Sequence, residues 1–173
     1  MAASDARLTL VLGGARSGKS RYAERLITAL PPPWIYVATA QAHYTEMAER
    51  IAAHRARRDA WWRTIEAPHD VASALVADEG PVLVDCVTLW LSNRMPADAD
   101  MDAEIAGLEA ALDACLGPVV LVSNEVGFGI VPDNALARRF RDLQGHLNQR
   151  LAARADRVVL VVAGIPVMVK EAR

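Results

Sequence analysis

The residues whose chemistry is clearest lie in Gly13–Ser20, which reads GGARSGKS and matches G-x-x-x-x-G-K-[ST] at every fixed position. Glycines in such a loop let the main chain approach a polyanion, and the loop's N–H groups point at phosphate oxygens. Lys19 is expected to reach the β- and γ-phosphates, and the Ser20 hydroxyl is expected to bind Mg²⁺. The pattern therefore predicts a nucleotide-binding loop made of Gly13, Gly14, Ala15, Arg16, Ser17, Gly18, Lys19 and Ser20.

The segments on either side of this loop are those that the motif requires. Leu8–Leu12 is a short apolar run containing Val and Thr, which is typical of a buried strand. Helix-forming residues follow Ser20 as far as Leu26. A glycine-rich turn that matches by chance is the alternative, and the order of strand, loop and helix argues against it.

An acidic residue, Asp85, follows another apolar run that begins at Val82. In a P-loop fold, an acid in this position holds the Mg²⁺ shell from the strand beside the loop. The alternative is an Asp that caps the segment after it. With the glycine loop present, Asp85 is predicted to form the metal site together with Ser20.

A histidine among arginines is the next candidate, in the predicted helix Glu46–Arg58. His54 shares one helical face with Arg50 and Arg58, and Arg55 and Arg57 flank it. Neighbouring guanidinium groups disfavour the imidazolium ion, and a neutral imidazole is a good nucleophile toward phosphorus. The alternative is a solvated helix with an inert histidine. His43, near the start of this helix, is the rival nucleophile.

Length and composition predict one domain spanning residues 1–173. The formal net charge is −2 and the sequence pI is about 6.1, so no basic surface for nucleic acid is indicated. No apolar run approaches the ~20 residues of a membrane span, and the first residues do not resemble a signal peptide. Cys86 and Cys115 have no disulfide-framework spacing. We therefore expect a cytoplasmic protein.

The elements that position these residues are short β-branched runs separated by helical stretches. Runs that are apolar on both faces indicate a parallel sheet with helices on both sides. Gly164–Pro166 interrupts the last run, and Val167–Lys170 is predicted to return as an antiparallel edge strand. The predicted fold is a P-loop NTPase-like three-layer α/β sandwich, whose parallel strands are Leu8–Leu12, Trp34–Ala38, Val82–Cys86, Val119–Ser123 and Val158–Val162.

The clearest helical pattern is Asp133–Arg154. Asp133 is the expected N-cap. Apolar residues recur at steps of three and four and predict a core-facing side, formed by Leu136, Phe140, Leu143, Leu147 and Leu151. The arginines and His146 on this helix are therefore poor candidates for a site.

Two segments are predicted to be loops. Met95–Met101 is polar and acidic and is the expected surface excursion. Ser123–Pro132 follows a strand, at the edge where open α/β sheets bind ligands, and carries Asn124 and Glu125 at its start. For this second loop, a functional role and a simple glycine-containing turn remain equally good interpretations.

Five blocks in order give the chain a family resemblance that runs from about Leu8 to Lys170. They are GGARSGKS, Ala38–Gln41, the spaced set His54, Arg58, Trp62, Thr64 and Glu66, then Val84–Asn93, and Ser123–Asp142. In these blocks the chain resembles the bifunctional adenosylcobinamide kinase / adenosylcobinamide-phosphate guanylyltransferase family of cobalamin biosynthesis. Asp59 and Arg55 depart from residues common in that family, proline and lysine respectively.

The resemblance implies two reactions. Adenosylcobinamide would be phosphorylated by ATP or GTP, and GMP would then pass from GTP to that phosphate, giving adenosylcobinamide-GDP and pyrophosphate. His54 would carry GMP as a phosphoramidate, Lys19 would act in catalysis, and Mg²⁺ would bind at Ser20 and Asp85. A homotrimer is also implied. The implied nucleotide site adds to the glycine loop the residues Ala38, Thr39, Ala40, Arg55, Ala56, Arg57, Arg58, Glu66 and Asp85.

Two other functions remain open from the residues alone. One is a plain P-loop small-molecule kinase in which His54 is a surface residue, because direct phosphoryl transfer needs no covalent histidine. The other is a non-enzymatic nucleotide-binding switch. The sequence does not locate a corrinoid pocket. Trp62 and Trp90 are candidates for lining it, although tryptophans more often belong to the core.

Overall fold

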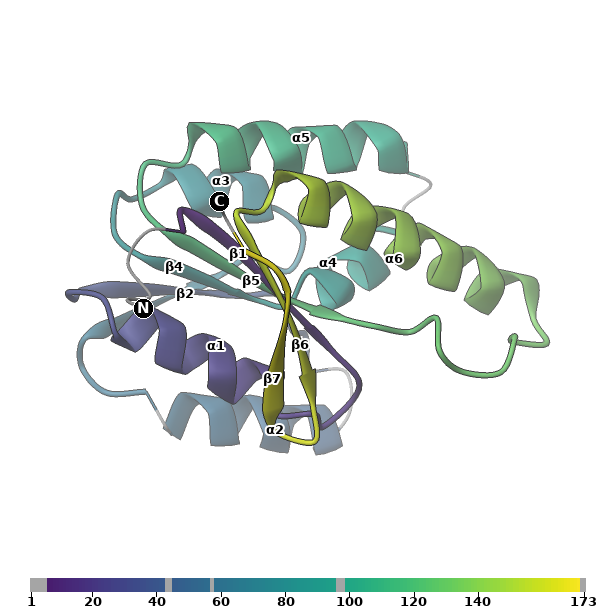
Figure 1. The fold of residues 1–173 in the computed structure, drawn as a ribbon, viewed down its shortest axis with the longest axis horizontal. Helices are drawn as coiled ribbons and strands as arrows, with labels where there is room; N and C mark the ends of the chain where they lie inside the picture. Colours follow the sequence, from purple (N-terminus) through teal and green to yellow (C-terminus); the bar gives the residue numbers. More distant parts are fainter. Residues whose placement is uncertain (1–5, 43–44, 57, 96–98, 172–173) are drawn as a thin grey trace.

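The computed structural model describes residues 6–42, 45–56, 58–95 and 99–171. Within these segments one seven-stranded sheet has the order β3-β2-β4-β5-β1-β6-β7 (Figure 1). Strands β1 to β6 pair in parallel, and β7 runs antiparallel to β6. The strands are β1 Leu8–Gly13, β2 Trp34–Ala38, β3 Trp62–Glu66, β4 Val82–Asp85, β5 Val119–Asn124, β6 Arg157–Val162 and β7 Ile165–Lys170.

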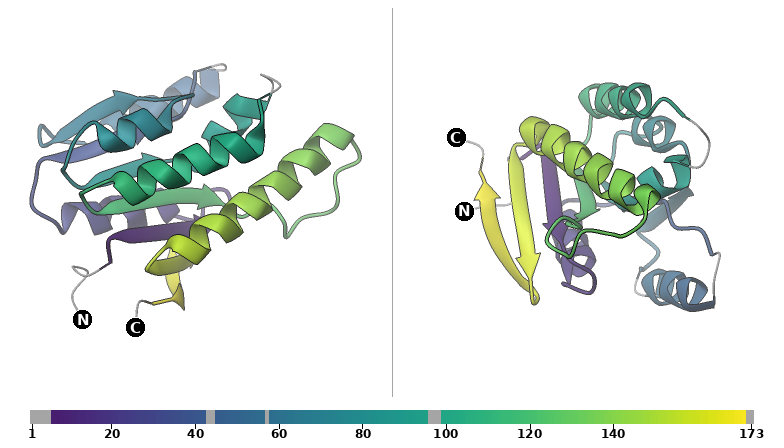
Figure 2. Two further views of the ribbon diagram at one scale, coloured as in Figure 1. Left: turned by 90° about the horizontal axis from the view of Figure 1, so that it is seen from above. Right: turned by 90° about the vertical axis from the view of Figure 1, so that its right-hand side faces the viewer.

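Helices cover both faces of the sheet (Figures 1 and 2). Helices α1 and α2 lie on one side, and α3 to α6 lie on the other. None of the helices in the described segments combines the length and the hydropathy that a bilayer crossing requires. Their bounds are α1 Lys19–Thr28, α2 Thr45–Ala56, α3 Val71–Val76, α4 Val87–Arg94, α5 Met101–Ala114 and α6 Ala135–Arg154.

The core is divided by the sheet because successive strand residues point to opposite faces. In β1, Leu10 belongs to the apolar cluster shared with α3 to α6, whereas Val11 belongs to the cluster shared with α1. In β4, Val84 and Leu83 divide in the same way. Burial on both faces explains why these strands read as continuous apolar runs, and it confirms the predicted three-layer sandwich.

The five predicted parallel strands and the antiparallel C-terminal strand are all present. The sequence prediction missed β3, which pairs with β2 at one edge of the sheet. In β3 the residues Arg63, Thr64 and Glu66 are exposed, so it lacks the apolar run of the central strands. The predicted helix Glu46–Arg58 corresponds to α2, which ends at Ala56.

Helix α6 is present, but two predictions about it were wrong. Its N-cap is Asn134 rather than Asp133, since the Asn134 side chain accepts a hydrogen bond from the N–H of Ala137 at 2.8 Å. Leu136 is 67% exposed rather than part of the core. The buried side includes Gln144 and Asn148, whose side-chain amides hydrogen bond to Ser123 Oγ and to the Asn124 carbonyl of β5.

The expected surface excursion at Met95–Met101 was also partly wrong. Met95 and Met101 are both buried, and Met101 begins α5 after the N-cap Asp100. Residues 96–98 lie outside the described part of the chain. The apolar ends of this segment therefore belong to the core, in the cluster shared by α3 to α6.

Candidate active site

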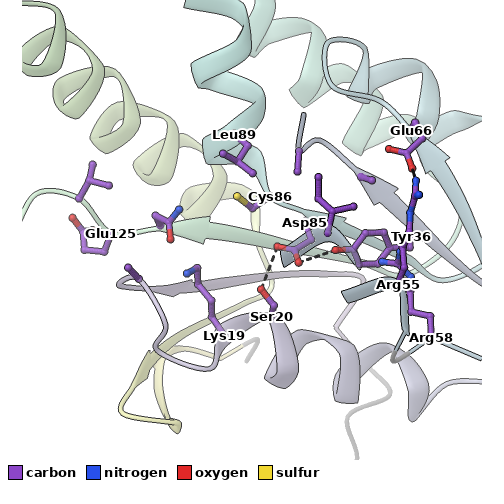
Figure 3. Close-up of a pocket in the computed structure, with 16 residues that line it drawn as sticks. Lys19, Ser20, Tyr36, Arg55, Arg58, Glu66, Asp85, Cys86, Leu89 and Glu125 are labelled. Atoms are coloured by element: carbon purple, nitrogen blue, oxygen red, sulfur yellow. Dashed lines mark hydrogen bonds and ion pairs between the residues drawn. The ribbon is translucent and has the colours of Figure 1, made fainter. Parts of the chain in front are cut away.

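A cavity of about 420 Å³ opens at the carboxyl ends of β1, β2, β4 and β5 (Figure 3). This is the edge at which open α/β sheets bind ligands. The lining residues come from the glycine loop, from α2, and from the segments that follow each strand. They are Ala15, Lys19, Ser20, Tyr36, Ala38, Ala40, Ile51, Arg55, Arg58, Glu66, Asp85, Cys86, Leu89, Asn124, Glu125 and Val126.

The glycine loop connects β1 to α1, as the motif predicts. Gly18 has φ +93°, a left-handed conformation that favours glycine, and it precedes α1 without a side-chain cap. A Cβ on Gly13 would lie 2.7 Å from the Val161 carbonyl oxygen, so only glycine fits there without movement. Lys19 is 8% exposed, and its Nζ donates to the Gly14 carbonyl at 3.0 Å. The loop thus holds a nearly buried ammonium group at the cavity.

Asp85 connects the glycine loop to β2. Its Oδ1 accepts a hydrogen bond from Ser20 Oγ at 3.3 Å, and its Oδ2 accepts one from the Tyr36 hydroxyl at 2.9 Å (Figure 3). The prediction that this acid lies on the strand next to the glycine loop was wrong in the strand order, because β5 lies between β4 and β1. Asp85 nevertheless reaches the first turn of α1 through Ser20.

The Tyr36 hydroxyl is held in its protonated form. Burial, and next the charge of Asp85, raise the pKa of Tyr36 far above its ordinary value of 10. The phenol is therefore a hydrogen-bond donor to Asp85 across the neutral range. The ring of Tyr36 also packs edge-on against Trp62, with a centroid distance of 6.1 Å.

The pair Ser20 and Asp85 fits a magnesium ion in its chemistry. Both side chains offer hard oxygen atoms, and they lie close enough to share one ligand. No group of three or more His, Cys, Asp or Glu side chains that could hold a metal occurs in the described residues. In nucleotide sites Mg²⁺ usually takes one or two protein oxygens and completes its coordination with phosphate oxygens and water.

Two arginines reach the cavity from α2 and the segment after it. The Arg58 guanidinium carbon lies 3.7 Å from the centroid of the Tyr36 ring, a cation–π contact. Arg58 Nη1 is buried and donates to no acceptor within the described residues. Arg55 forms an ion pair with Glu66 at the end of β3. This side of the cavity is therefore cationic, and Arg58 Nη1 has no acceptor within the described residues.

The predicted residues fall into three groups. Nine of them line the cavity: Ala15, Lys19, Ser20, Ala38, Ala40, Arg55, Arg58, Glu66 and Asp85. Others support it, because Gly13, Gly14, Arg16, Ser17 and Gly18 complete the glycine loop, and Thr39 is fully buried with its hydroxyl bonded to the main chain of Cys86. Ala56 is exposed and does not line the cavity.

The predicted nucleophile cannot be placed in the same way. Residue 54 belongs to α2, three positions after Ile51, which lines the cavity, but the His54 side chain lies outside the described part of the structure. Arg57 and the rival His43 also lie outside it. The role of His54 therefore stays a prediction.

Sequence reasoning missed Tyr36, Ile51, Cys86, Leu89 and Val126 as lining residues. For Tyr36 a signal existed, since it lies two positions before Ala38 on the same strand and therefore on the same face of the sheet. Burial raises the pKa of Cys86 to about 11, so its thiol is not a nucleophile near neutral pH.

Comparison with solved structures bears on the fold alone. The chain is similar to the RadB recombinase, with a TM-score of 0.53 and 17% identity over 88% of this chain and 73% of that one. It is also similar to the flagellar accessory protein FlaH from Methanocaldococcus jannaschii, with a TM-score of 0.52 and 10% identity over 96% of this chain and 79% of that one.

Comparison with known sequences gives closer matches. The chain is 49% identical over 166 residues to the bifunctional adenosylcobalamin biosynthesis protein CobP of Pseudomonas aeruginosa, covering 93% of this chain and 96% of the relative. It is 46% identical over 181 residues to CobU of Salmonella typhimurium, described in the same words, covering 94% and 99%. Residues 9–169 match the family model for cobinamide kinase / cobinamide phosphate guanyltransferase. The chain therefore belongs to this family of bifunctional kinases and guanylyltransferases of cobalamin biosynthesis.

Proposed function

We propose that the cavity at the sheet edge binds the nucleotide for both reactions. The observation that carries this proposal is its lining, which combines Lys19, Ser20 and Asp85 with Arg55 and Arg58. The first three are the residues of a phosphoryl-transfer site, and the arginines come from the segment that carries the predicted nucleophile. The loop Gly13–Ser20 would hold the phosphates, with Arg58 Nη1 and Ser17 Oγ, both buried without a partner in the described residues, available to bind oxygen atoms.

In the kinase reaction the loop N–H groups and Lys19 hold the β- and γ-phosphates and stabilise the charge on the transferred group. Mg²⁺ at Ser20 and Asp85 would neutralise phosphate charge when bound. Glu125 is the candidate base for the acceptor hydroxyl, since it lies in the lining and the N–H of Gly127 fixes its Oε1 at 2.7 Å. ATP and GTP carry the same triphosphate, so the glycine loop, Lys19, Ser20 and Asp85 would contact both nucleotides in the same way.

In the transferase reaction His54 would be the nucleophile. The lone pair of its neutral imidazole forms a bond to the α-phosphorus of GTP while the bond to the bridging oxygen breaks and pyrophosphate leaves. An oxygen of cobinamide phosphate then attacks the same phosphorus, and the P–N bond breaks to regenerate the imidazole. Arg55, Arg57 and Arg58 would stabilise the phosphates during both steps. The remainder of the nucleotide site would be formed by Ala38, Thr39, Ala40, Ala56 and Glu66.

Incubation with GTP labelled at the α-phosphate tests this proposal. We expect an acid-labile, hydroxylamine-sensitive label on the protein, which His54→Asn abolishes while GTP binding is largely kept. His146→Asn is the matched control, because His146 is exposed on α6 away from the cavity. Absence of label from the unsubstituted protein would leave the plain kinase as the function, and a label that persists in His54→Asn would exclude His54 as the nucleophile.

We also propose that the protein works as a cytoplasmic homotrimer. The edge strand β7 supports the assembly, because all six of its residues are exposed and they include Ile165, Val167 and Val169. An exposed apolar edge strand is a surface that proteins usually cover. The two free, buried cysteines Cys86 and Cys115 are in keeping with a reducing compartment.

A further inference from the structure

The loop between β5 and α6, whose first residues line the cavity, exposes large apolar side chains further along. Phe128 is 85% exposed, Ile130 97%, Val131 61% and Leu136, in the first turn of α6, 67%. Single exposed apolar residues are ordinary on a protein surface, but four within nine positions form a patch that usually has a ligand or a partner. We call these four residues the apolar loop patch.

The loop is anchored to the cavity at its first residues. Asn124, Glu125 and Val126 line the cavity, and the N–H of Glu125 donates to the Gly13 carbonyl at 3.1 Å. Figure 3 shows Glu125 and Lys19 on the same side of the cavity. The apolar loop patch thus begins two residues beyond the cavity lining.

The far end of the loop is anchored as well. Arg138 Nη1 donates to the carbonyls of Pro132 and Asp133 at 3.0 and 2.8 Å, and Asn134 caps α6. Figures 1 and 2 show the loop and the start of α6 projecting beyond the carboxyl ends of the strands. The patch is therefore presented on a loop that is held at both ends and whose first residues line the cavity.

The size of the cavity requires a second surface for the acceptor. A cavity of about 420 Å³ is of the size that holds one drug-sized ligand, so a bound nucleotide fills it. Cobinamide is a macrocycle with broad apolar faces and amide arms, and only its aminopropanol arm has to approach the γ-phosphate. The ring must then stay outside the cavity, against whatever surface lies beside the opening.

We propose that the apolar loop patch is the binding surface for the corrin ring of cobinamide. The inference rests on the proposed nucleotide site, because that site fixes where the acceptor hydroxyl must lie. Phe128 offers an aromatic face for the macrocycle, and Ile130 and Val131 add aliphatic surface. The uncharged side chains of the patch suit a ring whose edge carries neutral amides. A second copy of this chain is the other possible occupant, and the test distinguishes the two.

The test is the double variant Phe128→Ser/Ile130→Ser, assayed for phosphorylation of cobinamide at saturating GTP. We expect the KM for cobinamide to rise at least about tenfold, equivalent to about 1.4 kcal/mol. The KM for GTP and the label from α-labelled GTP, neither of which involves cobinamide, should stay as in the parent. Leu116→Ser is the matched control, because Leu116 is 73% exposed and lies before β5, at its opposite end.

Two results would overturn the inference. One is a KM for cobinamide within about twofold of the parent. The other is a change in the sedimenting mass of the double variant together with loss of activity, which would make the patch a contact between subunits. If the double variant loses the label, the KM for cobinamide is measured instead with Ile130→Ala, which truncates a side chain that is 97% exposed. Failure of the nucleotide proposal itself is seen separately, as absence of label on the unsubstituted protein.

Discussion

Tyr36→Phe removes one hydroxyl from the site and keeps the ring. The hydroxyl donates to Asp85 Oδ2 at 2.9 Å, while the ring packs against Trp62 and under Arg58. The variant therefore loses the hydrogen bond that orients the Asp85 carboxylate and leaves both ring contacts in place. Ser20 bonds to the other oxygen, Oδ1, so the substitution acts on the orientation of Oδ2.

The magnitude follows from the role of Asp85 as a proposed magnesium ligand. Loss of a hydrogen bond that orients a ligating side chain costs roughly 10- to 100-fold in metal affinity. A hydrogen bond to a charged group also contributes about 1.5–3 kcal/mol to stability. We expect the Mg²⁺ concentration for half-maximal kinase activity to rise at least about tenfold, and the rate at saturating Mg²⁺ to return to within a few-fold of the parent.

The assay is the kinase rate as a function of free Mg²⁺ at a fixed concentration of nucleotide. Tyr22→Phe is the control, because the Tyr22 ring contacts Arg25 on α1 and removal of its hydroxyl leaves the Tyr36–Asp85 hydrogen bond in place. The pKa of Tyr36 lies above 10, so no step from this phenol is expected in the Mg²⁺ profile between pH 6 and about pH 9. A rate that falls by the same factor at every Mg²⁺ concentration would refute the reasoning.

Two further outcomes concern stability. Gly13→Ala should lower the free energy of unfolding by about 1–3 kcal/mol, because its Cβ would meet the Val161 carbonyl oxygen, whereas Gly14→Ala, whose Cβ meets no atom within 4 Å, should leave the thermal midpoint nearly unchanged. Equal midpoints for the two variants would contradict this. Hydrogen bonds from Arg150 lower the pKa of Glu109, so its contribution to stability is present above about pH 4.3 and is lost as the pH falls further. The free energy of unfolding of Glu109→Gln should therefore fall less steeply with decreasing pH below about pH 4.3 than that of the parent. An unchanged slope would show that the Glu109–Arg150 pair does not contribute to acid unfolding.

The elements that could be predicted from sequence are those with a strong local pattern. Val82–Asp85 and Val119–Asn124 are buried on both faces, so their composition alone indicates a central strand. β3 was missed because an edge strand with exposed Arg63 and Glu66 has no such composition. β3 forms a strand because it pairs with β2. The sequence of neither segment indicates that the two will pair.

The site divides in the same way. The glycine loop and Asp85 could be identified because their spacing is tied to phosphate and metal chemistry. The Tyr36–Asp85 hydrogen bond joins residues 49 positions apart, so no local sequence pattern predicts it. The strand order could not be predicted for the same reason, since the sequences of β1 and β4 do not show that β5 lies between them. Gln144 and Asn148 are buried polar residues whose burial depends on Ser123 and Asn124 lying opposite them, and the helix sequence alone does not show this.

The parallel pairing of β1 with β5 has a consequence for how the two substrates meet. Gly13 lies in register with Asn124, and the main-chain hydrogen bond from Glu125 to Gly13 continues the ladder by one step beyond the strands. The segment that would grip the donor and the segment that would present the acceptor therefore leave the sheet side by side. Their separation is set by backbone geometry common to all sequences, so side chains in either segment can change to suit a different acceptor without altering the reach between the reacting groups.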